Sequence, residues 1–533
     1  MSKKVPEVSK ENLIILTFGL LIGFVVSLPH ILGSIDNKGA YQPFSVNSAV
    51  SYSKEEAYTY AAQVQHLVKG YLIGDPYIWE YRNGLSPYLG ELGSIVPVSI
   101  LSILLSSVPK GFMASDFVFP FTLFLLISKN LKNLGFNLSF TLFAASAVLV
   151  IPFLSVLIPK ITSYGTVLTG IENGPLLFTR TPHPQISDVY LFCAIFTSIW
   201  FLKSKNPKRV IILPIILGLS LYSSVYVAST IILASLIIAP FAAKNLDKKQ
   251  ITKILIIGAI VSLPLLLNFY LTREILSKEF ILRFSQEKNF LFPIQIRYLL
   301  IAFLLYKFRP RDPIYKVLFI YVVCAAVLID FHQIILGRDL QGDHWITRVI
   351  APLATLSLLL ITYTFFKKAN YRLWTLATLS ILIFGFYVQN NWYQNNKSYL
   401  TQDTRTASLI MQINTMGNNY VVGTLNTSLG DEIRATTGIW TYLSPGDRSY
   451  ISTAEQIQRA CDLLVLQKGT STLEEANEAL LYELGLEAKN KKTVEKVQRE
   501  LSQCAQKNNT TPSFKLDYLI VESENGEYSL KKI

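Results

Sequence analysis

LIILTFGLLIGFVVSLPHILGSI, residues 13–35, indicates that the chain is a membrane protein. The stretch holds no Asp, Glu, Lys or Arg and is long enough to cross a bilayer as one helix. It exceeds the apolar core of a signal peptide, and no small-x-small cleavage site stands before Asp36. Because three lysines precede it within residues 1–10, we expect a first transmembrane helix with a cytoplasmic N-terminus.

The same apolar pattern recurs along most of the chain. Of its 533 residues, 51% are hydrophobic and only 16% are charged, which does not fit a soluble multidomain enzyme. Together the runs predict about eleven helices in a mainly α, polytopic transmembrane bundle. The ten later runs are residues 114–128, 138–158, 188–202, 209–222, 225–243, 251–271, 293–307, 314–332, 345–366 and 371–389.

The formal charge of +13 arises largely from short basic clusters between the apolar runs. Such clusters favour the anionic inner leaflet of a membrane, so we expect lipid contact and no nucleic-acid partner. If they are cytoplasmic, residues 92–107 form an interfacial or re-entrant outer segment, and an odd number of spans puts the C-terminal region outside. The clusters are residues 129–133, 203–209, 244–249, 307–316 and 367–372.

The composition becomes polar at about residue 390. Strand-like VVGTL (421–425) and YLIVES (518–523) stand among charged helical stretches, which predicts a small soluble α/β domain. We therefore divide the chain into a membrane domain, residues 1–390, with a first outer loop at 36–112, and an extracytoplasmic domain, residues 391–533. The sequence leaves open whether Cys461 and Cys504 of this domain form a disulfide.

The first outer loop contains two adjacent carboxylates at the start of a predicted helix. Ser53 and Glu56 have the S-x-x-E form of a capping box, so we expect a helix from Ser53 and a bond from Glu56 back to the cap. Glu55 has no such local role, and the helix N-terminus keeps it ionised. Glu55 is therefore either a solvated residue that favours the helix dipole or a free base.

Three stretches resemble the outer loops of the GT-C superfamily of membrane glycosyltransferases, in particular bacterial, mannosyltransferase-like members that use polyprenyl-phosphate sugars. They are EEAYTYAAQVQHLVKGYLIGDPYIWEYRN (55–83), RTPHPQIS (180–187) and DFHQIILGRDLQGDHWITR (330–348). The resemblance implies a GT-C-like bundle and an inverting sugar transfer to a hydroxyl at the outer face, with an acidic residue of the first loop as base. We take Glu55 as the candidate base; because the family often has Asp at this position, its neighbour Glu56 remains the alternative.

Cationic and aromatic residues of the same loops are candidates for substrate binding. Arginines suit the oxygens of a departing phosphate, although an interfacial Arg often only anchors a helix end. A histidine between two prolines is held in a stiff loop, where it either meets the substrate or is structural. The candidates are Arg180, His183, Gln185, Arg338, His344 and Arg348, and the resemblance adds Tyr77 and Glu80 of the first loop.

Acidic and histidine side chains are also dense between residues 330 and 344. Asp330, His332, Asp339, Asp343 and His344 have irregular spacing that matches no recognised ligand pattern. We predict no metal site and no cofactor.

The expected partners are therefore a polyprenyl-phosphate sugar, a lipid, glycan or protein acceptor, and membrane lipids. Two other functions stay open. A flippase or transporter of lipid-linked sugars should carry ionisable residues near the middle of its spans and show repeated halves, and the spans here hold little charge. A non-catalytic assembly protein would work through its C-terminal domain, where we recognise no catalytic motif.

Overall fold

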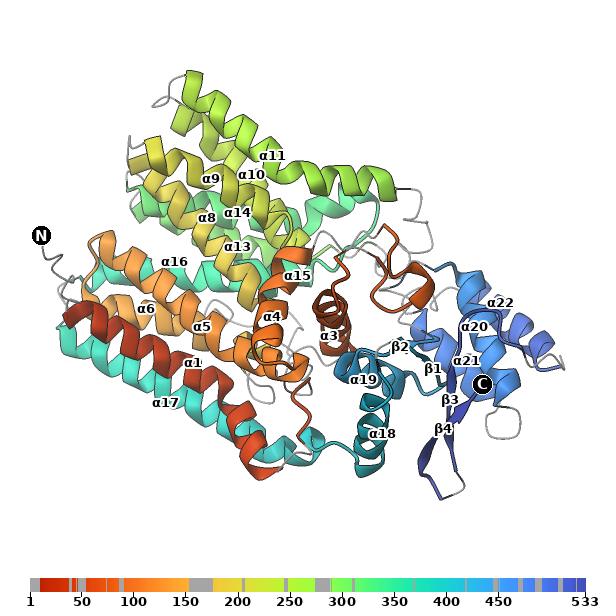
Figure 1. Cartoon of the computed structure of the whole chain (residues 1–533). Helices are drawn as coiled ribbons and strands as arrows, with labels where there is room; N and C mark the ends of the chain where they lie inside the picture. The colour runs from red at the N-terminus through yellow and green to blue at the C-terminus, as the bar shows by residue number, and fades with distance from the viewer. Residues whose placement is uncertain are drawn as a thin grey trace, which may run out of the picture.

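The computed structural model has a helical bundle at one end and a small α/β domain at the other (Figure 1). It describes residues 10–37, 41–44, 46, 54–72, 74–85, 91–152, 176–203, 207–243, 248–273, 288, 290–308, 312–367, 370–417, 419–443, 449, 451–467, 473–484, 491–506, 511–523 and 525–533. The mainly α fold class with a C-terminal α/β domain is confirmed.

Each of the eleven predicted apolar runs carries a helix. Seven helical segments of the described chain are long and apolar enough to cross a membrane, and four of the eleven helices, α6, α9, α10 and α13, are not among those seven. The helices are α1 (Lys10–Asp36), α5 (Val108–Asn133), α6 (Leu138–Val150), α8 (Gln185–Lys203), α9 (Pro207–Ser220), α10 (Val225–Ala243), α11 (Lys248–Thr272), α13 (Phe292–Phe308), α14 (Pro313–Leu336), α16 (Ala351–Phe365) and α17 (Tyr371–Asn396).

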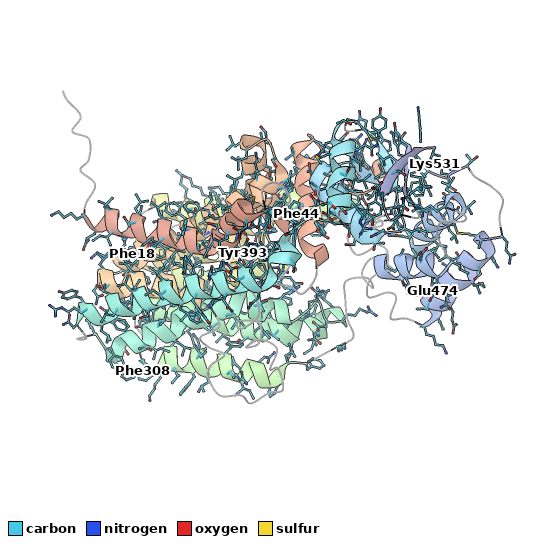
Figure 2. The ribbon with its side chains drawn as sticks, turned by 90° about the horizontal axis from the view of Figure 1, so that it is seen from below. Phe18, Phe44, Phe308, Tyr393, Glu474 and Lys531 are labelled. Atoms are coloured by element: carbon cyan, nitrogen blue, oxygen red, sulfur yellow. A yellow bond between two sulfur atoms is a disulfide. The ribbon has the colours of Figure 1, made fainter. Side chains whose placement is uncertain are left out.

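The bundle packs around one apolar core. α1 lies between α5 and α17, α17 packs on α6, and α14 packs on α10 and α13. α11 packs mainly on α9, and most of its apolar side chains stay exposed, which suits a helix that faces lipid. Figure 2 shows Phe18 and Phe308 on the bundle and Glu474 and Lys531 on the domain at the other end.

Short helices of the first outer loop lie between the bundle and the C-terminal domain (Figure 1). They are α3 (Lys54–Val68), the 3-10 turn η1 (Trp79–Tyr81) and α4 (Leu92–Leu104). α3 begins one residue after the predicted start, and Ser53 itself lies outside the described residues. α4 runs across the direction of α1 and α17 (Figure 1), and its interfacial placement stays a prediction.

The C-terminal domain holds a four-stranded sheet in the order β2-β1-β3-β4. β1 (Val421–Gly423) is parallel to β2 (Trp440–Thr441) and to β3 (Tyr518–Glu522), and β4 (Tyr528–Lys532) closes the edge antiparallel to β3. β1 and β3 fall in the two predicted strands. The domain helices are α18 (Thr404–Asn414), α19 (Thr427–Thr437), α20 (Thr453–Leu466), α21 (Leu473–Glu483) and α22 (Lys491–Cys504).

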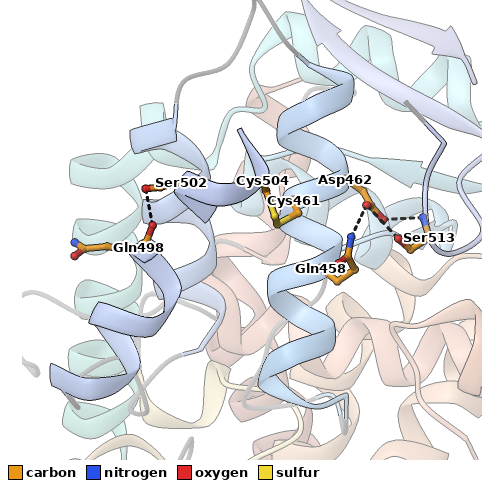
Figure 3. Close-up of a disulfide and its surroundings, with 7 residues drawn as sticks. All are labelled: Gln458, Cys461, Asp462, Gln498, Ser502, Cys504 and Ser513. Carbon is orange, nitrogen blue, oxygen red and sulfur yellow. Dashed lines mark hydrogen bonds between the residues drawn. A yellow bond between two sulfur atoms is a disulfide. The ribbon is translucent and has the colours of Figure 1, made fainter. Parts of the chain in front are cut away.

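A disulfide joins two helices of this domain. Cys461 of α20 and Cys504 of α22 are bonded with an S–S distance of 2.02 Å (Figure 3). Asp462, the next residue of α20, accepts hydrogen bonds from the backbone N–H and the hydroxyl of Ser513. The chain after α22 is thus fastened to α20 beside the disulfide.

Candidate functional site

The loop before α8 meets the first outer loop. It follows the 3-10 turn η4 (Leu177–Thr179), and its Thr181–Pro182 and His183–Pro184 peptide bonds are both cis. His183 is only 1% exposed, and its ring meets that of Tyr60 of α3 edge-on, with the centroids 5.4 Å apart. The predicted residue His183 therefore lies next to the helix that carries the two candidate carboxylates, and Arg180 belongs to the same loop.

Asp116 of α5 is the hub that holds this loop in place. Its Oδ1 atom accepts hydrogen bonds from the Thr181 hydroxyl at 2.6 Å and from the Gln185 amide at 2.5 Å. Its Oδ2 atom lies 2.6 Å from Nε2 of His30 in α1, and Nδ1 of His30 lies 2.7 Å from the Tyr41 hydroxyl. All of these side chains except Tyr41 are buried, so one network ties two spans to the loop.

Gln185 belongs to this network and not to an open surface. Its amide nitrogen donates to Asp116 and to the Phe178 carbonyl, and its Oε1 atom lies 2.9 Å from the Thr181 hydroxyl. Both amide hydrogens are therefore committed to the protein. The sequence analysis placed Gln185 in substrate binding, and the structure places it as a support of the loop.

A second group of candidates gathers around a π-helical segment. Asp343–Trp345 (α15) leads into η5 (Ile346–Ile350), the segment before α16, and such segments are frequent at functional sites. Nη2 of Arg348 lies 3.5 Å from Nε2 of His344, and the Arg348 guanidinium lies 5.3 Å from the ring centroid of Tyr226 of α10. The structure thus brings these two predicted residues together, beside an aromatic ring.

The two groups lie at the same end of the bundle. η5 packs against α8 and α10, and α8 starts directly after the loop that carries Arg180 and His183. Arg180 is buried, whereas Arg338, in the loop after α14, is partly exposed. The basic and imidazole groups of these two segments therefore lie on elements that pack against each other.

The acidic stretch around residue 339 forms a closed turn. His332 contacts Asp339, with Nε2 and Oδ1 3.1 Å apart, and the Gly342 amide donates to the same oxygen. Asp330 accepts from the Leu291 amide. Among the described residues no three His, Cys, Asp or Glu side chains form a group able to hold a metal ion, and the Asp343 side chain lies outside them.

Tyr77 and Glu80 lie apart from these groups, at the contact with the C-terminal domain. The Tyr77 hydroxyl donates to the Thr59 carbonyl, and Glu80 accepts hydrogen bonds from Arg459 and from the Lys515 amide. Gly74 begins this turn at φ +124°, and a Cβ there would lie 1.9 Å from the Arg82 carbonyl oxygen, so only glycine fits.

The C-terminal domain also forms hydrogen bonds with the C-terminal end of α3. The Gln65 amide donates to the carbonyls of Ala435 and Thr436, and Lys69 donates to the Gly438 carbonyl at the end of α19. Burial, together with the nearby charge of Arg434, lowers the pKa of Lys69 to about 7. α3 is thus held at both sides, by the loop before α8 and by the C-terminal domain.

Glu55 and Glu56 occupy the first turn of α3, and their side chains lie outside the described residues. In helical register position 56 comes four residues before Tyr60, and position 55 comes four residues before Thr59. Tyr60 contacts His183, whereas the Thr59 carbonyl meets the turn that ends at the C-terminal domain. Position 56 therefore shares the helix face that leads to the loop before α8.

The sequence analysis missed Asp116 and His30. Each is a polar residue inside an otherwise apolar run, which is itself a signal of function or of a buried partner. Their partnership spans 86 positions and could not be found without the fold.

The fold defines a multi-pass membrane protein with an α/β domain at one end of its bundle. No protein-family model matches the sequence, and the search of curated proteins gave no match. Among solved structures, the chain is similar to the crystal structure of the Archaeoglobus fulgidus oligosaccharyltransferase in the apo form. The TM-score is 0.45 at 11% identity, over 100% of this chain and 75% of that chain. The function proposed below rests on the residues of this chain.

Proposed function

We propose that this protein is a membrane glycosyltransferase that transfers a sugar from a polyprenyl-phosphate donor to a hydroxyl acceptor at the outer face of the membrane. One observation carries the proposal. The ring of Tyr60 in α3 contacts His183 in the loop before α8, and η5, which carries Arg348 beside His344, packs against α8. α3 bears two carboxylates, and the loop and η5 bear cations.

The chemistry needs one carboxylate and a cationic site. The acceptor oxygen attacks the anomeric carbon, the carbon–phosphate-oxygen bond breaks, and the acceptor proton passes to a carboxylate at the start of α3. A single displacement inverts the anomeric centre and uses no enzyme nucleophile, unlike a retaining glycosidase. Arg348, with His344 beside it, suits the charge that grows on the departing phosphate.

The register of α3 bears on which carboxylate is the base. Position 56 lies on the face of Tyr60, which meets His183, and position 55 lies on the face of Thr59. This arrangement favours Glu56 as the base and gives Glu55 a supporting role at the helix start. Glu56 would then not be committed to the predicted capping box.

The disulfide supports placement of the C-terminal domain outside the cytoplasm. Disulfides persist in oxidising compartments, and Cys461–Cys504 lies in that domain. α1 begins at the opposite end of the bundle (Figure 1), so a cytoplasmic N-terminus and an outer site are consistent with each other.

A transporter of lipid-linked sugars is the second candidate, and the His30–Asp116 pair is the observation that favours it. Chains of His and Asp inside spans serve as proton relays in transporters. Here Asp116 also accepts from Thr181 and Gln185, which ties the pair to the loop and gives it a structural role at the outer end. We therefore rank the transferase first.

The test is sugar transfer by the full chain in nanodiscs, with a panel of radiolabelled polyprenyl-phosphate sugars and with lipid and glycan acceptors. Wild type is compared with Glu55→Gln and Glu56→Gln, and correct folding is checked by gel filtration. We expect Glu56→Gln to lose about a hundredfold or more in transfer and Glu55→Gln to lose less. Movement of a lipid-linked sugar across the bilayer without any transfer would favour the transporter.

A further inference from the structure

The carboxyl group of Asp188 is a buried group that the site described above does not use. Asp188 lies in the first turn of α8, is 0% exposed, and neither of its oxygens has a hydrogen-bond partner in the part of the chain that the structure describes. Burial of a carboxylate without donors is costly, and nearly all buried polar groups in proteins are satisfied. The burial of Asp188 therefore needs an explanation, such as a ligand that binds its carboxyl group.

Asp116 provides a comparison within the same region. Both aspartates are fully buried and flank the same loop, and Asp116 has a contact to His30, Thr181 or Gln185 at each of its oxygens. Among the described residues, donors reach one carboxylate and none reaches the other. The difference is therefore specific to Asp188, since Asp116 is equally buried.

The position of Asp188 relates it to the proposed site. It comes one turn after Gln185, on a helix that packs against α5, α14 and η5. η5 carries Arg348, and the loop directly before α8 carries His183. A ligand whose phosphate met Arg348 would bring the group attached to that phosphate to this part of the bundle.

The chemistry of the residues selects the class of ligand. A bare carboxylate takes either a metal ion or several hydrogen-bond donors. A metal ion needs further ligands, and among the described residues no group of three His, Cys, Asp or Glu can supply them. Adjacent hydroxyl groups of a sugar satisfy both oxygens of a carboxylate without any other charged residue.

We propose that Asp188 is a sugar-binding residue, whose two oxygens accept hydrogen bonds from hydroxyl groups of the donor sugar. The inference rests on the proposed function for the identity of the ligand and deepens it, because it names the residue that distinguishes a sugar-bearing lipid from a bare one.

The test measures binding and stability separately. The full chain in nanodiscs is titrated with short-chain polyprenyl phosphates that carry different sugars, with the same polyprenyl phosphate lacking a sugar, and with free methyl glycosides. We expect wild type to bind at least one sugar-bearing probe about tenfold more tightly than the bare phosphate. Asp188→Asn should lose that preference and bind the bare phosphate as wild type does.

The Tm of the ligand-free protein distinguishes a ligand-binding role of Asp188 from a structural one, because the two roles predict opposite effects of removing the carboxyl group. Asp188→Leu removes a buried carboxylate that has no hydrogen-bond partner in the described part of the chain, so the Tm of this variant without ligand should rise above that of wild type. The control is Asp312→Asn, at the N-cap of α14, where Asn caps as well as Asp does. A fall in Tm for Asp188→Leu would mean that the carboxylate stabilises the fold, which overturns the proposal.

Three further outcomes would also decide. Retention of the sugar preference by Asp188→Asn overturns the inference, even if transfer activity supports the proposed function. Stabilisation of wild type but not Asp188→Asn by Mg²⁺, Mn²⁺ or Ca²⁺ alone overturns it in favour of a cation site. Sugar preference that depends on Asp188, without sugar transfer in any assay, supports the inference while the transferase proposal fails.

Discussion

Nη2 of Arg459 lies 3.0 Å from Oε2 of Glu80, 379 positions earlier in the chain. The Arg459 side chain is 1% exposed and also donates to Glu455 and to the Tyr442 carbonyl, whereas that of Glu80 is 27% exposed. Arg459 is therefore the buried residue at the contact between the C-terminal domain and the first outer loop, and Glu80 is the residue of the loop that binds it.

Arg459→Met is expected to destabilise the protein more than Glu80→Gln does. The first change leaves two carboxylates without their cation, at a cost of about 2–3 kcal/mol, reduced because both are partly exposed. The second change leaves Arg459 paired with Glu455 and should cost about 1 kcal/mol. Thermal unfolding followed by tryptophan fluorescence measures both, and equal losses would contradict this account.

Asp116→Asn is expected to loosen the loop before α8. An Asn keeps one acceptor oxygen for Thr181 and Gln185 but replaces the carboxylate oxygen that contacts His30 with an amide, so we expect a loss of about 2 kcal/mol. Unfolding in nanodiscs gives the free energy, with Asp312→Asn as a control expected within about 0.5 kcal/mol of wild type. A neutral Asp116→Asn would show that the network does not hold the loop.

Lys69 gives the stability of the protein a dependence on alkaline pH. Its pKa is about 7 when folded and close to 10.5 when exposed, so between these values the unfolded chain binds more protons. The contribution of Lys69 to stability is therefore most favourable above pH 10.5 and is lost as the pH falls to 7. The difference in unfolding free energy between wild type and Lys69→Met should rise across this window, and a flat difference would refute the shift.

The Cys461–Cys504 disulfide is expected to stabilise the C-terminal domain by about 4 kcal/mol, from the entropy of closing a loop over 43 positions. The double change of both residues to Ser should lower the Tm of this domain, and a reductant should do the same to wild type only. Thiol counting in the denatured, unreduced protein should find two reactive cysteines, Cys193 and Cys324. Four reactive thiols would show that the bond does not form.

Features with a local period were predictable from the sequence. Apolar length alone located all eleven bundle helices, because a span needs a continuous run of such residues. The strands at 421–423 and 518–522 were found by their apolar, β-branched residues. β2 was not found, since two residues, Trp440 and Thr441, carry no period.

Contacts between distant segments were not predictable. The sequence grouped Glu80 with substrate-binding residues, and only the fold shows its contact with Arg459. The contact between His344 and Arg348, in comparison, joins residues only four positions apart, so local helical spacing is enough to account for it. That Asp188 has no hydrogen-bond partner among the residues the structure describes is a property of the folded interior and could not be inferred from the order of residues.

The contacts between the first outer loop and the C-terminal domain can form only late in the synthesis of the chain. Residues 54–85 emerge from the ribosome early, whereas Arg459 and Lys515, which bind Glu80, are translated near the end. The ring of Trp79 lacks its contact with the ring of Trp440 until all the later spans have been made. Nascent chains therefore carry this loop without its partners in the C-terminal domain, and a chain cut short before residue 515 would leave Glu80 without the Lys515 amide.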